Sequence, residues 1–508
     1  MKVMVGPRGE SSLIIDTAWL LAARTVSFIV SLALPLFLVR HLNQVEFGLY
    51  KQAFLIANSA ITMVPLGFGM SALYFLPREP EKQGRTVLNI LIFNLVAGGL
   101  VCFALMVRPS IVQLIFGGPE MVPYAAGLGL LILFWTAASS FDTIAIACQD
   151  MKAASVIIIF IQLTRTAFVL AAGVFLGSVH ALVWAAVIQG VCQTIGLVLF
   201  LKFRFPGFWR HFDAALMRRQ LSYALPLGAA GLLYVLQVDL HNYVVSNRFG
   251  PALFAVYGIG TAQLPLVNML YEAATSVLIP RISVLQRNHE NREIVLQLAR
   301  AMRKLAAAYL PIYALLLVVG PEFIRFLFTD RYLSSWPVFA TNLTLLPLSI
   351  ILMDPLYRAY AEQRYFLIRV RMVLVVLVLL LLWIGTAYFG LVGAIAAVVV
   401  VNCAERMVMG IRFGRVLGVT RSDLSLTKDM GKLGVASAAG AVVAAVIRAN
   451  MLSARPLVIL LVCGAAFSMV YILAILLLRV PSLEEKRQVL DRLMPMLPAS
   501  LRLRRTQP

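Results

Sequence analysis

The basic residues of this chain alternate along the sequence, and this pattern constrains the fold more than any other feature. Long apolar stretches are separated by gaps that are alternately rich and poor in lysine and arginine. Rich gaps include residues 78–85, 202–219 and 281–304, whereas each gap between them holds about one or two basic residues. Basic residues resist translocation and accumulate in cytoplasmic loops. The pattern predicts a multi-pass protein of the cell (inner) membrane with both termini in the cytoplasm.

The composition agrees with a membrane protein. Hydrophobic residues make up 61% of the 508 residues, 13% are charged, and the mean hydropathy is +0.88. A soluble fold of this length does not hide so much apolar surface. The net charge of +21 would indicate a nucleic-acid partner for a soluble protein, but here the cations face one leaflet and its anionic headgroups. We therefore expect membrane lipids, and no nucleic acid, as partners.

A bilayer core needs roughly 20 apolar residues per helix, and the chain supplies that length repeatedly. The sequence predicts an all-α integral membrane protein of about fourteen spans, at residues 12–39, 47–76, 87–107, 123–148, 153–177, 180–201, 221–247, 252–280, 304–328, 336–357, 366–388, 390–413, 432–449 and 455–479. Several spans contain a proline, which favours kinked helices packed around a cavity: Pro35, Pro65, Pro226, Pro265, Pro311 and Pro347.

An internal repeat divides the predicted spans into two halves. The pattern Phe47-Gly-Leu-Tyr50 opens the second span, and Phe254-Ala-Val-Tyr257 lies early in the eighth. Because six is an even number of spans, the two halves have the same orientation, as in transporters with parallel repeats. The predicted parts are an N-terminal lobe (1–203), a cytoplasmic linker (204–220), a C-terminal lobe (221–417), two trailing helices (418–479) and a cytoplasmic amphipathic tail (480–508).

Cationic side chains inside the predicted spans of the first half are candidate substrate ligands. Arg24 and Arg165 lie in the middle of the first and fifth spans, and Lys51 lies near the outer end of the second. Buried charge is costly and commonly marks a transport pathway, and a guanidinium binds phosphate with two hydrogen bonds. The structural alternative is that each arginine pairs with an aspartate between helices, for example Arg165 with Asp142.

The second half carries acidic side chains in its predicted spans instead. Asp239 and Glu272, in the seventh and eighth spans, have no obvious local partner, whereas Asp354 and Glu405 lie near arginines at the cytoplasmic edge. A desolvated carboxylate can carry a proton or bind a sodium ion. Asp239 and Glu272 are therefore candidate ion-coupling residues, and the alternative is a buried structural hydrogen bond.

The sequence contains no signal for an enzyme. There is no phosphate-binding loop, no metal-ligand cluster and no nucleophile motif in a polar loop, and no soluble segment is long enough for a catalytic domain. The five cysteines all lie in apolar stretches, so neither disulfides nor a metal site is expected. We expect a protein without catalytic residues, metal or cofactor.

Three segments give the chain a family resemblance: Phe47-Gly-Leu-Tyr50, Leu66-Gly-Phe-Gly69 and Leu221-Ser-Tyr-Ala-Leu-Pro-Leu-Gly228. With the opening helix and the charged linker, they resemble the polysaccharide transporter branch of the MOP exporter superfamily, the O-antigen flippase-like proteins. The resemblance covers residues 12–479. It implies two six-helix lobes, two trailing helices, and a cavity that opens alternately inward and outward.

The resemblance also implies a substrate, a polyprenyl-diphosphate-linked oligosaccharide flipped to the periplasmic leaflet. Partners would include a polysaccharide polymerase and glycosyltransferases. Lipid II flippases, a sister branch, carry basic residues in helices one, two and eight. Arg24 and Lys51 match the first two, but the eighth span has Glu272, which counts against a lipid II substrate.

Two other function classes stay open at the level of sequence. A cation-coupled multidrug antiporter would have a cavity rich in carboxylates and aromatic rings. Asp239 and Glu272 keep this class open, whereas Arg24 and Arg165 disfavour it. A membrane scaffold without transport activity would show no effect of charge-conserving substitutions in the cavity.

The predicted topology gives a direct test. Single cysteines introduced beside Arg108, Arg248 or Arg325 should react with a membrane-impermeant thiol reagent added from the periplasm. Cysteines beside Lys82, Arg210 or Arg292 should stay unlabelled until the membrane is opened. The reverse labelling pattern would overturn the orientation and, with it, the direction of transport.

Overall fold

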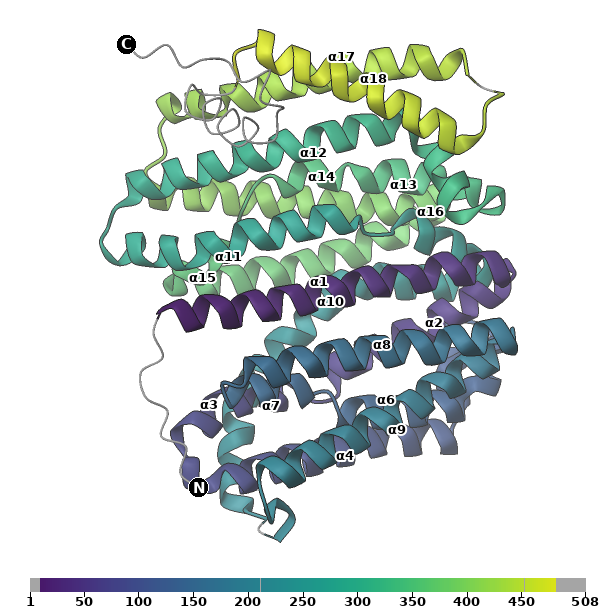
Figure 1. The fold of residues 1–508 in the computed structure, drawn as a ribbon, viewed down its shortest axis with the longest axis vertical. Helices are drawn as coiled ribbons and strands as arrows, with labels where there is room; N and C mark the ends of the chain where they lie inside the picture. Colours follow the sequence, from purple (N-terminus) through teal and green to yellow (C-terminus); the bar gives the residue numbers. More distant parts are fainter. Residues whose placement is uncertain (1–9, 211, 452, 481–508) are drawn as a thin grey trace, which may run out of the picture. The chain divides into compact units, whose positions relative to one another are not determined.

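The computed structural model describes residues 10–210, 212–451 and 453–480, and within these residues it contains helices and turns but no strands. This confirms the all-α class. The predicted tail, 480–508, lies outside the described residues except for Val480. The α-helices are α1 (Glu10–His41), α2 (Gln44–Met63), α3 (Ser71–Arg78), α4 (Gln83–Val107), α5 (Ser110–Phe116), α6 (Ala125–Ala137), α7 (Phe141–Ala147), α8 (Met151–Phe175), α9 (Val179–Arg204), α10 (Ala214–Gly260), α11 (Pro265–Arg287), α12 (Asn291–Phe328), α13 (Trp336–Leu343), α14 (Leu345–Ser349), α15 (Asp354–Ala359), α16 (Arg364–Leu417), α17 (Lys428–Ala449) and α18 (Pro456–Leu477) (Figure 1).

Nine helices of the described chain are long and apolar enough to cross a membrane, or eleven if two sharply bent helix pairs count as one span each. This is fewer than the fourteen expected from the sequence, for identifiable reasons. Helix α16, with 54 residues, consists of two helices joined at a kink at Gly390 (φ 58°, ψ −134°), and it is counted as one span although the sequence predicts two there. Helices α13, α14 and α15 have only 8, 5 and 6 residues, so none of them spans a bilayer alone.

Both spans that carry the repeated sequence pattern are interrupted. Between α2 and α3 the chain turns at Leu66 and Gly67, which have positive φ angles of 47° and 70°, and the two helices are bent by 45°. Between α10 and α11, residues 261–264 are not helical. Pro65 and Pro265 lie at these two interruptions, because a proline removes a helical hydrogen bond.

Contacts divide the described chain into two compact units. The first unit comprises the residues up to 269, together with 327–342 and 365–405; the second comprises 270–326, 343–364 and the residues from 406 onward. In the first unit, α4, α6, α9 and α8 pack in that order, and α1 lies along α8 (Figure 1). The predicted lobe boundaries at 203 and 221 stay a prediction.

Glycines allow α4 and α6 to pack closely within the first unit. A Cβ atom at Gly98 would lie 3.1 Å from the Cα atom of Leu133, and one at Gly129 would lie 3.2 Å from the Cα atom of Cys102. Helices in lipid gain little from the hydrophobic effect, so close backbone approach through small residues provides much of their attraction. Cys102 is buried in this contact as a small packing residue.

In the second unit, α17 and α18 form a helical hairpin that packs on α12. Val319, Ala444, Cys463 and Phe467 make the apolar part of this contact. A polar contact also closes the second unit near α17: Arg292 binds Asp423 in the 3₁₀ turn η7 (Arg421–Thr427). The Thr420 backbone N–H and the Arg292 guanidinium lower the pKa of Asp423 to about 2, so this pair stays charged at neutral pH.

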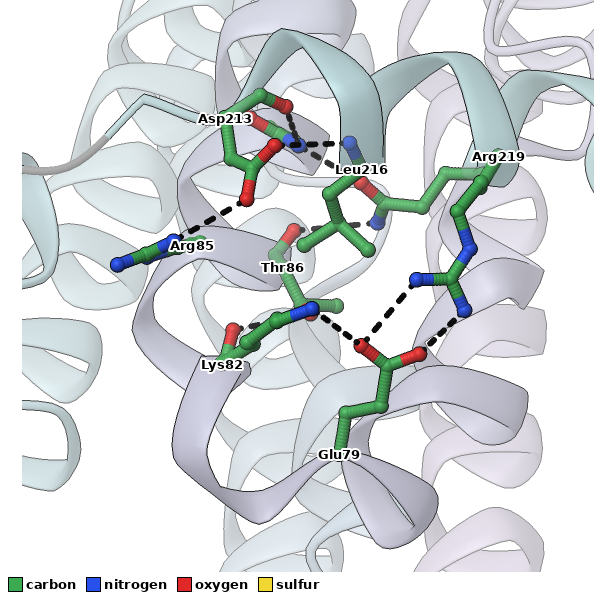
Figure 2. Close-up of polar contacts among 9 residues, drawn as sticks. Glu79, Lys82, Arg85, Thr86, Asp213, Leu216 and Arg219 are labelled. Atoms are coloured by element: carbon green, nitrogen blue, oxygen red, sulfur yellow. Dashed lines mark hydrogen bonds and ion pairs between the residues drawn. The ribbon is translucent and has the colours of Figure 1, made fainter.

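The start of α10 is attached to the turn between α3 and α4 by a polar cluster, which we name the α4–α10 clasp (Figure 2). Arg219 and Lys82 both bind Glu79, and Arg85 Nη1 lies 3.2 Å from Asp213 Oδ2. Beneath these ion pairs, Asn89 Nδ2 donates to Gln220 Oε1 over 2.9 Å, and Gln220 Nε2 donates to Ser71 Oγ and to the carbonyl of Thr86.

The ion pairs of the clasp are exposed and its amides are buried, so the two groups contribute differently to the stability of the fold. The Arg219, Lys82 and Arg85 side chains are 54, 41 and 45% exposed, and exposed ion pairs contribute about 0–1 kcal/mol. Hydrogen bonding from Arg219, then from Lys82, lowers the pKa of Glu79, so this ion pair is lost only at acid pH. Asn89 and Gln220 are fully buried, and an unsatisfied buried amide costs about 1–3 kcal/mol.

We therefore expect Gln220→Ala to destabilise the protein more than Arg85→Ala. Removing the Gln220 amide takes away one of the two acceptors of Asn89 Nδ2 and the donor to Ser71 Oγ, both buried, whereas water replaces the exposed guanidinium of Arg85. Thermal unfolding of each purified variant in detergent gives the comparison. An equal or larger decrease in Tm for Arg85→Ala would show that the ion pairs, rather than the buried amides, hold the clasp.

Candidate functional site

A polar cavity of about 420 Å³ lies within the first unit, between α1, α2, α8 and α10. Each of these helices contributes side chains at helical spacing, such as Tyr50, Phe54 and Asn58 along one face of α2. The lining residues are Ser31, Leu34, Pro35, Tyr50, Lys51, Phe54, Leu55, Asn58, Gln162, Arg165, Asn242, Phe254, Gly258, Thr261, Ala262 and Gln263. Two of the three cations singled out in the sequence, Lys51 and Arg165, are therefore brought together here.

Arg165 is held in the cavity by an amide and by aromatic rings. Its Nη2 atom donates to Asn58 Oδ1 over 3.3 Å, and its Cζ atom lies 4.2 Å from the ring centre of Trp135 and 5.4 Å from that of Phe54. The predicted alternative is an ion pair between Arg165 and Asp142. The structure instead places Arg165 against side chains of α2 and α6. The lining residues include no carboxylate, so neutral groups hold the hydrogen-bond donors of Arg165 in place and its charge is not neutralised there.

A second layer of side chains orients the Trp135 ring beneath Arg165. Trp135 Nε1 donates to Gln189 Oε1 over 2.9 Å, and Gln189 Nε2 donates to Gln193 Oε1 over 3.2 Å. Phe54 meets the same ring edge to face, with ring centres 5.8 Å apart. A cation over a fixed aromatic face is stabilised by the ring quadrupole. The guanidinium is thus positioned before any ligand arrives.

Lys51 reaches the cavity from the neighbouring position on α2. Its Nζ atom donates to the Gly258 carbonyl over 3.0 Å and lies 5.8 Å from the ring centre of Phe47. A Cβ atom at Gly258 would lie 2.9 Å from Lys51 Cδ, so a larger residue there would displace the lysine. The ammonium keeps two further donors, which is the chemistry of a phosphate ligand.

The character of the cavity is cationic and amide-rich. Its described lining contains Lys51 and Arg165 together with the side-chain amides of Asn58, Gln162, Asn242 and Gln263, and it contains no aspartate or glutamate. Guanidinium and ammonium groups bind phosphate oxygens, and amides donate to and accept from hydroxyl groups. The arrangement suits a ligand that combines a phosphate with a polar, hydroxyl-bearing group.

Arg24, the third predicted cation, is not among the lining residues. Its side chain is exposed. It lies seven residues before Ser31 on α1, which is two helical turns or about 10 Å along the same face. Arg24 is therefore in line with the cavity but separated from Lys51 and Arg165.

Asp239, a predicted ion-coupling residue, lies in α10 beside the cavity rather than in it. It is half-buried, and its Oδ2 atom accepts a hydrogen bond from Ser59 Oγ on α2 over 3.3 Å. Ser59 directly follows the lining residue Asn58. His241, two residues later, is buried, and its Nδ1 atom lies 2.8 Å from the hydroxyl of Tyr257.

The other acidic residues have different surroundings. Glu272 belongs to the second unit and is exposed there. Asp354 accepts a hydrogen bond from the Tyr271 hydroxyl over 3.0 Å, within the same unit. Glu405 accepts from Gln237 and lies 3.9 Å from Arg371. Asp239 and Glu272 thus belong to different units.

Sequence reasoning missed the polar, uncharged residues of the cavity. Asn58, Gln162 and Asn242 are amides inside apolar helices, and each one lines the cavity. A signal was present, because Tyr50, Phe54 and Asn58 are spaced four residues apart and share one helix face. A search for charged residues alone does not find such a row of uncharged polar and aromatic residues on one helix face.

Three solved structures illustrate the fold. The chain is similar to the lipid II flippase MurJ in an inward closed conformation, with a TM-score of 0.70 and 13% identity over 91% of this chain and 98% of that chain. It is also similar to an inward-facing multidrug resistance MATE family transporter of the MOP superfamily (TM-score 0.56, 15% identity, coverage 84% and 97%). A third similar structure is a MOP superfamily transporter from Pyrococcus furiosus, described by a reversed polarity of its binding pocket. It has a TM-score of 0.53 and 15% identity over 79% of this chain and 96% of that chain.

These likenesses show the fold of the MOP superfamily transporters, in agreement with the resemblance predicted from the sequence. None of the curated proteins compared with the chain matches it. A family model described as "Polysaccharide biosynthesis protein" matches residues 37–337, a range that includes Lys51, Arg165 and Asp239. Because this match covers more than half of the sequence, the chain belongs to the polysaccharide biosynthesis protein family, and its fold is that of the MOP superfamily transporters.

Proposed function

We propose that this protein is a flippase for a polyprenyl-diphosphate-linked oligosaccharide. It would move the glycan from the cytoplasmic to the outer leaflet by alternating access, for the synthesis of a cell-surface polysaccharide such as lipopolysaccharide or an exopolysaccharide. The observation that carries the proposal is the cavity in which Lys51 and Arg165 lie among amides without a carboxylate. Family membership in polysaccharide biosynthesis supports the same substrate class.

The chemistry of the cavity matches the difficult part of this substrate. A diphosphate must leave water to cross the membrane, and fixed cations replace its hydration. Arg165 and Lys51 would hold the diphosphate, and the amides of Asn58, Gln162 and Asn242 would contact the sugar. Arg24, two turns away on α1, would meet the diphosphate on its way to the cavity. The lipid tail stays in the bilayer.

We further propose the full architecture expected from the sequence, with fourteen spans in two parallel lobes and two trailing helices. Gly250 and Gly390 support it, because each has a non-helical backbone at a kink that divides a long helical element into two helices. The segments α11 and α13–α15 would complete the remaining spans as interrupted helices, which membrane proteins use where backbone lines a cavity. A polymerase and glycosyltransferases would act before and after the transport step.

Substituting Arg165 tests the proposed diphosphate site. Arg165→Ala should slow flipping of a fluorescent polyprenyl-diphosphate glycan in proteoliposomes by about 10- to 100-fold, because a hydrogen bond to a charged group contributes about 1.5–3 kcal/mol. Arg165→Lys should keep part of the activity, since the charge remains and the two-pronged geometry is lost. Arg24→Ala should have a smaller effect than Arg165→Ala.

Lys152→Ala is the matched control, because Lys152 is an exposed cation on the same helix and does not line the cavity. It should flip the glycan at the wild-type rate. Wild-type flipping by a folded Arg165→Ala protein would contradict the diphosphate site. Efflux of an organic cation by the wild-type protein, with no glycan flipping, would favour the multidrug antiporter instead.

Asp239 is our candidate for the coupling residue. Neutralising it with Asp239→Asn should stop net transport driven by an ion gradient while the glycan still binds, because a cation changes the conformational balance only through its differential affinity for the two states. Flipping is measured with a proton gradient and a sodium gradient imposed separately. Glu272→Gln is assayed in the same way, because Glu272 is the second candidate coupling residue; the variant of the carboxylate that carries the ion should lose gradient-driven transport and keep glycan binding. Unchanged gradient-driven flipping by Asp239→Asn would leave this carboxylate with a packing role.

A further inference from the structure

The last residue of α3, Arg78, rests on an aromatic ring at the surface of the first unit. Its Cζ atom lies 3.7 Å from the ring centre of Tyr74, and both side chains are exposed. Guanidinium donors radiate in the plane of the group, so contact through its face leaves them free for a ligand. This arginine is distant in sequence from the cavity residues and is not part of the cavity lining.

The ring under Arg78 is itself fixed by a neighbouring helix. The Tyr74 ring lies 4.6 Å from that of Tyr223 on α10, at an angle of 32°, and it meets Phe75 edge to face at 5.0 Å. Phe75 is buried. The two tyrosines thus form a platform that α3 and α10 hold jointly, next to the α4–α10 clasp.

The clasp uses two carboxylates near Arg78, Glu79 and Asp213, and the exposed Glu81 makes no ion pair among the described residues. Glu79, the next residue in the chain, binds Arg219 and Lys82, and Asp213 binds Arg85 (Figure 2). No ion pair of the described residues includes Arg78. The surface therefore presents one oriented guanidinium whose charge is not balanced by a fixed acid.

The position of the Arg78 guanidinium relative to the bilayer indicates which ligand it can bind. Residues 78–85 form a basic segment that the charge pattern assigns to the cytoplasmic side, directly after an apolar span. Leu73 and Tyr74, one turn earlier on α3, are 40 and 38% exposed, so apolar surface adjoins the cation. Tyrosine is enriched at the level of lipid headgroups, where phosphate is the abundant anion.

We propose that Arg78, supported by Tyr74 and Tyr223, is a binding site for the phosphate group of a lipid in the cytoplasmic leaflet. The guanidinium donates two hydrogen bonds to the phosphate oxygens, and the exposed face of α3 contacts the chain below the headgroup. The phosphate comes from a resident anionic phospholipid or from a polyprenyl diphosphate. This site is separate from the cavity and does not depend on the proposed transport activity.

Binding of defined lipids by the full-length protein tests the site. The protein is placed in nanodiscs of phosphatidylcholine, and affinities are measured for fluorescent phosphatidylglycerol in one arm and for a fluorescent polyprenyl diphosphate without a glycan in the other. Arg78→Ala should weaken binding by about tenfold in at least one arm. Loss of phosphatidylglycerol binding identifies a resident lipid, and loss of polyprenyl diphosphate binding identifies a substrate lipid; either result supports the site.

Variants of the platform separate binding from folding. Arg78→Lys should lose part of the affinity, Tyr74→Leu should weaken it by removing the ring, and Tyr74→Phe should retain it because the ring face remains. Arg218→Ala is the matched control, since Arg218 is an exposed cation at the start of α10 and makes no cation–ring contact among the described residues. Unchanged affinities of a folded Arg78→Ala protein in both arms, or an equal loss with Arg218→Ala, would overturn the proposal.

Discussion

The contact between α2 and α10 is the interaction on which the rest of the first unit depends. Gly48 lies against the carbonyl of Pro251 so closely that a Cβ atom would overlap it. Further along the same contact, Gln52 donates to Ser246 over 2.7 Å, and Ser59 donates to Asp239. Polar groups inside a membrane must be satisfied by protein, so these pairs fix the register of the two helices. The cavity lies beside this contact and takes residues from both helices.

Close packing also explains why the cavity holds its cations in defined positions. Gly258 leaves space for the Lys51 side chain and accepts its hydrogen bond, while Trp135 supports Arg165 from behind. Charges arranged before the ligand binds cost no reorganisation when a phosphate replaces water. Close packing therefore explains the glycine of the Phe47-Gly-Leu-Tyr50 pattern. Any side chain at Gly48 would separate α2 from α10 and move Lys51 away from Gly258.

The sequence predicted the helical membrane fold and its superfamily, because charge distribution and apolar length depend on the bilayer and not on tertiary packing. It also identified Lys51 and Arg165, since a cation in an apolar helix needs a polar environment. The sequence did not show that Arg24 lies outside the cavity, because the tilt of α1 decides which of its turns line the cavity. It missed Asn58 and Gln162, because these residues are uncharged and the packing of α2 and α8 decides which of their side chains line the cavity. The partner of Asp239 was likewise invisible, because Ser59 lies 180 residues away in the chain.

The position of Asp239 provides a physical route by which an ion bound there could influence the proposed glycan site in the cavity. Its carboxylate accepts from Ser59, and Ser59 neighbours Asn58, which in turn accepts from Arg165. Taking up a cation at Asp239 would weaken its hold on the Ser59 hydroxyl and so alter the α2–α10 contact that positions the cavity. A change of this kind affects glycan affinity only if the two conformations differ at this contact. The interruptions between α2 and α3 and between α10 and α11 are points at which such a difference can arise, because backbone there is not held by the hydrogen bonds of a continuous helix.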